Sequence, residues 1–312
     1  MYKRQPPNVP DLRVNISGIE LKNPVIAASG TLGYGVEFEE IVSLDKLGAL
    51  VVKGLSREPM PGNPPPRVFE TAAGMLNAIG LQNIGAREFV SERLPRLRRH
   101  KDVVVFANVF GSTIADYIEV INILNDGEGI AAYELNVSCP NTDSGGMAFG
   151  SDSGVLQELV FAATRRAERP VIVKLSPNVT SIPQVALAAE HAGADAISLV
   201  NTFVAMAIDA ETRKPRIANV TAGLSGPAIK PIALRMVYEA ARAVTIPVIG
   251  IGGITTATDV VEYMLAGATA IQIGTASFWD PVATENVVQA LTNWCIEHRV
   301  EKITDLIGGL QV

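Results

Sequence analysis

The chain has 312 residues, of which 48% are hydrophobic and 19% are charged, and its formal net charge is −6. This composition excludes an intrinsically disordered chain, and the net negative charge disfavours nucleic acid or an anionic membrane as a general partner. Met1–Pro10 lacks the apolar stretch of a signal peptide, and no apolar run reaches the roughly 20 residues of a membrane span. We therefore expect a soluble, cytoplasmic protein.

Short apolar runs rich in Val, Ile and Ala recur along the chain and alternate with stretches of helical period. Continuous apolar runs of this length are typical of parallel strands that are buried on both faces. The predicted strands are Pro24–Ser29, Ala49–Lys53, Val103–Asn108, Tyr133–Ser138, Val171–Ser176, Ala196–Asn201, Pro247–Gly252 and Ala270–Gly274. The predicted helices are Phe38–Leu47, Ile114–Leu124, Ser153–Glu168, Ile182–His191, Ile229–Val244 and Thr256–Leu265.

Eight strands that alternate with helices indicate a closed (β/α)8 TIM barrel, here a single domain over residues 1–312. Leu12–Leu21 alternates polar and apolar residues, and we expect it to form a hairpin at the floor of the barrel. Two connections, at about 54–85 and 202–226, are too long for simple loops. Both follow a strand, so both lie on the C-terminal face where barrel active sites sit, and such long connections are usually functional or disordered.

Polar side chains mark the C-terminal tips of the predicted strands. Lys53 and Lys174 end apolar strands, and a buried ammonium without a partner is costly, so two of them at one barrel face imply an anionic or electron-rich ligand. A terminal Ser or Asn taken alone is more often a cap or a turn residue. Taken together, the tips predict a ligand site that includes Ser29, Asn108, Asn136, Asn201 and Thr202.

Glycines follow the last two predicted strands, at Gly252-Gly253 and at Gly274-Thr275. Glycine lets backbone N–H groups approach an anion closely, and the ends of strands seven and eight are the usual phosphate site of this fold. The pattern predicts a phosphate-bearing ligand and leaves open whether it is a flavin, a nucleotide or a sugar phosphate.

The two cysteines, Cys139 and Cys295, are too few for a disulfide framework or for the four ligands of an iron–sulfur cluster. The histidines stand in or beside helical segments, so we expect no metal site. Cys295 lies in a helical stretch and is interpreted as a packing residue. Cys139 lies among polar and turn-forming residues in a loop over the expected ligand, where a thiol near cations can act as a base or a nucleophile.

Three features together, Lys53, the segment from Gly74 to Asn83 and the Asn-Val-Ser-Cys-Pro-Asn stretch at 136–141, closely resemble the class 1 dihydroorotate dehydrogenases. The match extends over nearly the whole barrel. Glu70-Thr71 followed by Gly74-Met75-Leu76-Asn77 resembles the 1B subclass in particular.

The resemblance implies oxidation of dihydroorotate to orotate in pyrimidine biosynthesis, with FMN as the hydride acceptor and Cys139 as the base. It implies FMN contacts from Ser29, Lys53, Gly54, Asn108, Asn136, Lys174, Val200, Gly226, Gly252, Gly253, Gly274 and Thr275. It implies substrate contacts from Lys53, Asn77, Ala78, Ile79, Gly80, Leu81, Asn136, Asn201 and Thr202.

The 1B resemblance further implies that electrons pass to NAD through a partner subunit that carries FAD and a [2Fe–2S] cluster, because this chain lacks the cysteines for the cluster. The implied assembly is a homodimer of this chain within a heterotetramer. Two alternatives stay open: a stand-alone 1A-type enzyme that uses fumarate, and a barrel isomerase or lyase that acts on a sugar phosphate without a flavin.

Overall fold

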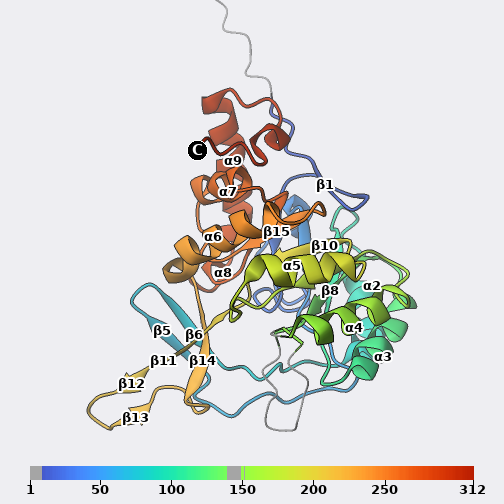
Figure 1. Ribbon diagram of the computed structural model, residues 1–312, viewed down its shortest axis with the longest axis vertical. Helices are drawn as coiled ribbons and strands as arrows, with labels where there is room; N and C mark the ends of the chain where they lie inside the picture. Colours follow the sequence, from blue (N-terminus) through green and yellow to red (C-terminus); the bar gives the residue numbers. More distant parts are fainter. Residues whose placement is uncertain (1–8, 139–148, 151) are drawn as a thin grey trace, which may run out of the picture.

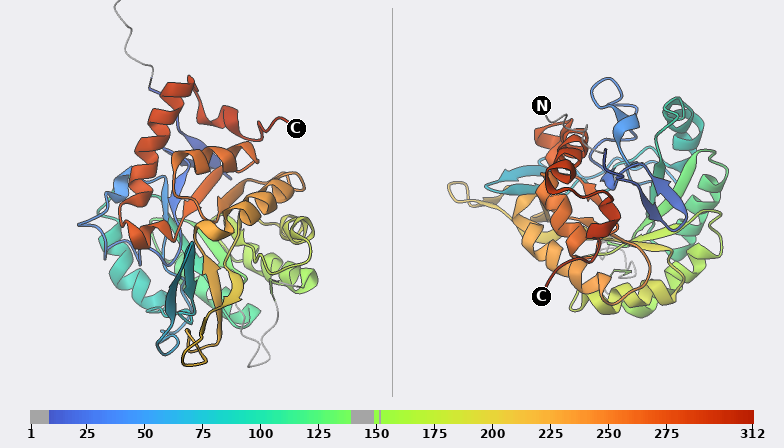
Figure 2. Two further views of the ribbon diagram at one scale, coloured as in Figure 1. Left: turned by 90° about the vertical axis from the view of Figure 1, so that its left-hand side faces the viewer. Right: turned by 90° about the horizontal axis from the view of Figure 1, so that it is seen from above.

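Eight parallel strands of the computed structural model close into a barrel, and Figures 1 and 2 show the helices outside the ring of strands. The structure describes residues 9–138, 149–150 and 152–312. The barrel strands, in order round the ring, are β3 (Val25–Ala27), β4 (Ala49–Val51), β7 (Val105–Val109), β8 (Ile130–Asn136), β9 (Val171–Lys174), β10 (Ala196–Leu199), β15 (Val248–Ile251) and β16 (Ala270–Ile273). Because β16 pairs with β3, the sheet has no free edge, and the TIM barrel prediction is confirmed.

All eight predicted barrel strands are present, with boundaries that differ by a few residues. Nearly every residue of these strands is buried, because one face packs inside the barrel and the other packs against the helices. The largest difference is β8, which begins at Ile130 rather than at Tyr133 and ends at Asn136.

Six longer helices in the described part of the chain cover the barrel. They are α3 (Ile114–Asn125), α4 (Ser153–Thr164), α5 (Ile182–His191), α6 (Lys230–Ala241), α7 (Ala257–Leu265) and α9 (Ala283–His298). Three of them, α3, α4 and α7, begin at a side-chain cap. Thr113 and Thr256 each accept a hydrogen bond from the backbone of an aspartate three residues on, which stabilises the first turns of α3 and α7. Cys295 is buried in α9, in agreement with the packing role expected for it.

The helix predicted for Phe38–Leu47 is wrong, because this segment forms separate turns and the short 3-10 helix η1 (Leu44–Lys46). Val42 and Leu44 are both buried, and residues two apart on one α-helix cannot face the same core. A helical segment that is not among the predicted ranges stands before β7. It consists of α1 (Ala86–Glu88), the π-helical turn η2 (Phe89–Arg93) and α2 (Leu94–Leu97).

The predicted hairpin is present as β1 (Val14–Ile16) paired with β2 (Ile19–Leu21). The Ser17 hydroxyl in its turn donates to the carbonyl of Asp195, the residue that precedes β10. The hairpin therefore lies at the N-terminal end of the barrel, opposite the strand tips that carry the polar residues.

The two long connections together form a second sheet, which Figure 1 shows projecting beside the barrel. The first connection supplies β5 (Val68–Thr71) and β6 (Gly74–Asn77), and the second supplies β11 (Phe203–Met206) and β14 (Thr221–Ser225), in the antiparallel order β11-β14-β6-β5. The hairpin of β12 (Ile208–Asp209) and β13 (Lys214–Pro215) extends from it. The second sheet has a small core of its own, formed by Leu76, Ile217 and Ala222. Neither connection is therefore a disordered loop.

The short elements η3 (Pro227–Ile229), α8 (Ala276–Trp279) and η4 (Ile303–Leu306) complete the fold. Among the helices in the described ranges, none has both the length and the apolar character that crossing a membrane requires.

Candidate active site

A pocket opens at the C-terminal ends of the barrel strands, and most of its lining comes from the tips of β3, β4, β7, β8, β9 and β10. The lining residues are Ser29, Gly30, Lys53, Gly54, Leu81, Asn108, Phe110, Asn136, Lys174 and Asn201. Eight of these ten residues are among the predicted site residues, and the sequence did not point to Gly30 or Phe110. The C-terminal face is therefore where the structure brings the polar strand tips together.

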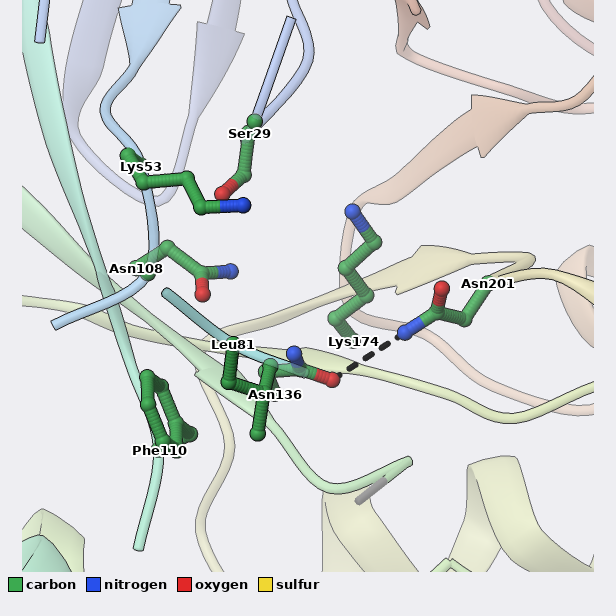
Figure 3. A pocket seen from close by; sticks show the side chains of 10 residues that line it. Ser29, Lys53, Leu81, Asn108, Phe110, Asn136, Lys174 and Asn201 are labelled. Carbon is green, nitrogen blue, oxygen red and sulfur yellow. Dashed lines mark hydrogen bonds between the residues drawn. The ribbon is translucent and has the colours of Figure 1, made fainter. Parts of the chain in front are cut away.

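Two lysine side chains enter the pocket from different sides, as Figure 3 shows. Burial lowers the pKa of the Lys53 ammonium below its usual value, and the neighbouring charges of Lys174 and Arg67 lower it further. No carboxylate lies within ion-pair distance of Lys53 in the part of the chain that the structure describes. Lys174, at 7% exposure, brings a second basic side chain to the pocket, and the uncompensated Lys53 suits the pocket to an anionic ligand.

Lys174 faces a carboxylate that the sequence reasoning missed. Glu134, which is fully buried on β8, places Oε1 3.8 Å from the Lys174 Nζ atom. The same oxygen accepts a hydrogen bond of 2.8 Å from the Asn108 amide. The available signal was an acidic residue inside an apolar strand, two positions before Asn136, since residues two apart on a strand point to the same face.

Three asparagine amides complete the polar lining. Asn201 donates to the side-chain oxygen of Asn136 over 3.1 Å, the contact drawn in Figure 3. The Tyr117 hydroxyl donates to the backbone carbonyl of Asn136 and holds this strand end in place. At the tip of β3, the Ser29 hydroxyl donates to the carbonyl of Val52. Because an amide carries both donors and acceptors, this lining can match a planar heterocycle that presents alternating donors and acceptors.

The predicted glycine positions form a second group at the ends of β15 and β16. At Gly253 the backbone is left-handed, with φ +67°, and a Cβ atom there would stand 2.8 Å from the Gly226 carbonyl. Gly226 in turn lies beside Thr275, whose hydroxyl donates to the Ser225 hydroxyl over 2.8 Å. Gly252 packs against Ala233 and Tyr263, and Gly274 packs against Ala28 and Thr31. Gly226, Gly252 and Gly253 let the chain come closer than a side chain would permit, as a phosphate cradle requires, whereas a Cβ atom at Gly274 would make only ordinary contacts.

The remaining predicted site residues lie around the pocket rather than in its lining. Asn77 is on β6 and pairs with Gly223 of the second sheet. The segment that follows contacts Asn63 through Ala78, Ile79 and Gly80. It then enters the pocket at Leu81, whose φ is +57°. Val200 and Thr202 flank Asn201 after β10. Cys139, the expected base, lies outside the described residues.

The donor set fits FMN. The buried ammonium groups, the amides and the adjoining glycine cradle offer sites for an electron-rich ring and for a phosphate. Within residues 9–138, 149–150 and 152–312 there is no group of three His, Cys, Asp or Glu side chains that could hold a metal ion.

Comparison with known proteins identifies the family. The sequence profile described as "Dihydroorotate dehydrogenase" matches residues 11–294. "Putative dihydroorotate dehydrogenase A (fumarate)" of Solibacter usitatus is 59% identical over 302 residues, which cover 97% of this chain and 99% of that protein. "Dihydroorotate dehydrogenase B (NAD(+)), catalytic subunit" is 53% identical in Pelobacter propionicus and 50% identical in Citrifermentans bemidjiense, with the same two shares covered in each. The chain therefore belongs to the dihydroorotate dehydrogenase family.

Proposed function

We propose that this chain is the FMN-carrying catalytic subunit of a class 1B dihydroorotate dehydrogenase, which oxidises dihydroorotate to orotate in pyrimidine biosynthesis and passes the electrons to NAD through a partner. The observation that carries the proposal is the convergence of Lys53, Lys174 and three asparagines on one pocket of this barrel. Family membership favours this reaction over the sugar-phosphate isomerase or lyase that the glycines alone left open.

Each group of residues has a proposed part in binding. Lys53 pairs with the substrate carboxylate, which supplies the counter-charge that Lys53 lacks among the described residues. Asn136 and Asn201, with Asn77 to Leu81 and Thr202, orient the pyrimidine ring. FMN is held by Ser29, Gly54, Asn108, Lys174 and Val200 beside the ring and by Gly226, Gly252, Gly253, Gly274 and Thr275 at the phosphate.

The proposed chemistry removes a proton from C5 and a hydride from C6 of dihydroorotate. FMN, when bound, supplies the hydride acceptor. Cys139 is the base that takes the proton, a role supported by its sequence context and by the cations of the adjoining strands. The ammonium of Lys174 offsets negative charge that develops on the ring beside it.

The proposal also names the electron acceptor, NAD, and a partner subunit through which the electrons reach it. Relatives at 50–53% identity carry the name "B (NAD(+)), catalytic subunit", and a catalytic subunit implies a second one. Two cysteines in 312 residues cannot ligate a [2Fe–2S] cluster, which favours a partner subunit that carries both the cluster and FAD. We propose a homodimer of this chain within a heterotetramer, and NAD, a soluble acceptor, suits a cytoplasmic location. The relative at 59% keeps the stand-alone fumarate enzyme as the second candidate.

A visible spectrum tests the central proposal. The purified protein should show flavin absorption, and anaerobic addition of dihydroorotate should bleach it as orotate appears. A colourless protein that binds no added FMN would contradict the proposal, and so would a flavin that dihydroorotate leaves oxidised.

A further inference from the structure

Glu134 lies inside the barrel, below the pocket floor, and its side chain is fully buried. Its carboxylate accepts three hydrogen bonds: from Asn108 at 2.8 Å, from the Ser198 hydroxyl at 2.9 Å and from the Gln272 amide at 2.6 Å. These donors stand on β7, β10 and β16, on different sides of the ring. A carboxylate replaces the Val, Ile and Leu side chains that ordinarily fill a barrel interior.

The Glu134 carboxylate also has a charged partner, the ammonium of Lys174. Lys174 Nζ lies 3.8 Å from Glu134 Oε1, and both side chains are buried. Lys53 lies across the pocket, close enough for the charge of Lys174 to lower its pKa, and it has no such carboxylate among the described residues. Two charged groups among the described residues thus act on Lys174: Glu134 on β8 attracts its ammonium, and Lys53 after β4 repels it. Of the two pocket lysines, one has a built-in counter-ion and the other is left for a ligand.

We infer that Glu134 is a positioning residue for the flavin side of the site: it keeps the Lys174 ammonium charged and fixes the Asn108 amide. The amide donates its Nδ2 hydrogen to Glu134, which leaves its Oδ1 atom directed toward Gly54 in the pocket lining. The inference rests on the proposed function, because it assigns Lys174 to bound FMN.

The competing interpretation is that Glu134 only fills the barrel, and the network offers a variant that separates the two roles. Glu134→Gln keeps the shape and removes the charge. Gln272 Oε1 is buried and has no partner among the described atoms, so rotation of the Gln272 amide lets it accept from the new Gln side chain. The Ser198 hydroxyl can turn as well. The hydrogen bonds can therefore be kept while the counter-ion of Lys174 is lost.

The readout is the number of protons taken up with two electrons by the bound flavin, obtained from the pH dependence of its midpoint potential above neutral pH. In the wild type, where Glu134 is the counter-ion of Lys174, reduction brings one proton, because the ammonium groups of the pocket offset the remaining negative charge. In Glu134→Gln, two buried basic groups share the pocket with no described carboxylate beside them, so the pocket holds one proton fewer in the oxidised enzyme and takes it up on reduction. We expect one proton per two electrons in the wild-type holoenzyme and two in the variant.

Ser198→Ala is the matched control, because it removes one hydrogen bond from the same carboxylate and leaves the charge. It should keep one proton per two electrons. A value of one in Glu134→Gln as well would overturn the inference, as would a value of two in both variants. A protein that binds no flavin would instead contradict the proposed function, so the two failures are distinguishable.

A double variant covers the case in which Glu134→Gln folds poorly. Lys174→Met alone leaves Glu134 without its ammonium, whereas Glu134→Gln/Lys174→Met removes both charges. Coupled charges predict that the double variant folds and unfolds at a higher urea concentration than Glu134→Gln, because the ammonium that lost its counter-ion is gone as well. A double variant that is no more stable than Glu134→Gln, or that does not fold, would overturn the inference.

Discussion

At the scale of single residues, the pocket contains two lysines with different surroundings. Lys174 has Glu134 beside it, while Lys53 is held near another ammonium without a described carboxylate. Such an arrangement destabilises the ligand-free protein and strengthens binding of an anion, because the ligand supplies the missing charge.

Lys53→Met tests this division of roles. A hydrogen bond to a charged group contributes about 1.5–3 kcal/mol, so loss of the ammonium should weaken dihydroorotate binding roughly 10- to 100-fold. Since the folded-state pKa of Lys53 is lowered, its charge costs stability in full below that pKa, and the cost falls as the pH rises from there to the ordinary pKa of the unfolded chain. The ligand-free variant should therefore unfold at a higher temperature than the wild type at neutral pH. Unchanged affinity for orotate, which has the same carboxylate and does not reduce the flavin, measured by titration of the oxidised flavin spectrum, would contradict the role of Lys53.

Cys139→Ser tests the proposed base. A serine hydroxyl is a much weaker acid than a thiol, so it cannot serve as the base near neutral pH. FMN content should stay at the wild-type level, while reduction of the flavin by dihydroorotate, followed by stopped-flow absorbance, should slow at least 100-fold. The rate should recover in part as the pH rises. Cys295→Ser, at the buried cysteine of α9, is the matched control and should reduce its flavin at the wild-type rate.

At the scale of elements, the sequence predicts the barrel well because each barrel strand is buried on both faces and is therefore apolar throughout. It also predicts most of the pocket, since parallel strands must end at one face and their polar tips must meet there. Ser29, Asn108 and Lys174 follow from that rule alone.

The second sheet could not be predicted in the same way. Its strands lie far apart in the sequence, and β14 pairs with β6 across some 150 residues. One face of this sheet is exposed, so the apolar signal is weak in each strand. Glu134 was missed for a related reason: a charged residue inside an apolar strand gains its partners only when β7, β9, β10 and β16 close around it.

Gly253 lies at the turn that follows β15, close to the backbone of Gly226 and Lys230. Gly253→Ala places a Cβ atom in a left-handed conformation and 2.8 Å from the Gly226 carbonyl. Gly308→Ala is the matched control, since Gly308 has nearly the same φ, +69°, and nothing within 4 Å of the added atom. The control should lose about 1–2 kcal/mol of unfolding free energy from backbone strain alone.

Gly253→Ala should lose more stability than Gly308→Ala and should bind FMN at least 10-fold more weakly, because the carbonyl of Gly226 and the start of α6 must shift. Urea unfolding and equilibrium dialysis of FMN measure the two effects. Equal losses in both variants, with equal FMN affinity, would show that the glycine cradle does not hold the flavin.

At the scale of the whole molecule, the closed barrel and the second sheet contribute different parts of the pocket. The closed barrel fixes the buried charges, and the second sheet, formed by the connections after β4 and β10, brings the segment from Asn77 to Leu81 over the pocket. The pocket in this arrangement fits the proposed flavin and pyrimidine, and the proposed route to NAD lies through another protein.

Reoxidation of the isolated chain tests that route. After anaerobic reduction by dihydroorotate, the chain alone should not be reoxidised by NAD, because hydride or single electrons must first reach a flavin that faces the nucleotide. Fumarate should also fail. Co-expression with the partner subunit should give a complex that contains FMN, FAD and two irons per pair of chains and that forms NADH. Sedimentation should give a heterotetramer for this complex and a dimer for the chain alone. Rapid reoxidation of the isolated chain by fumarate would instead identify the stand-alone enzyme suggested by the name of the relative at 59% identity.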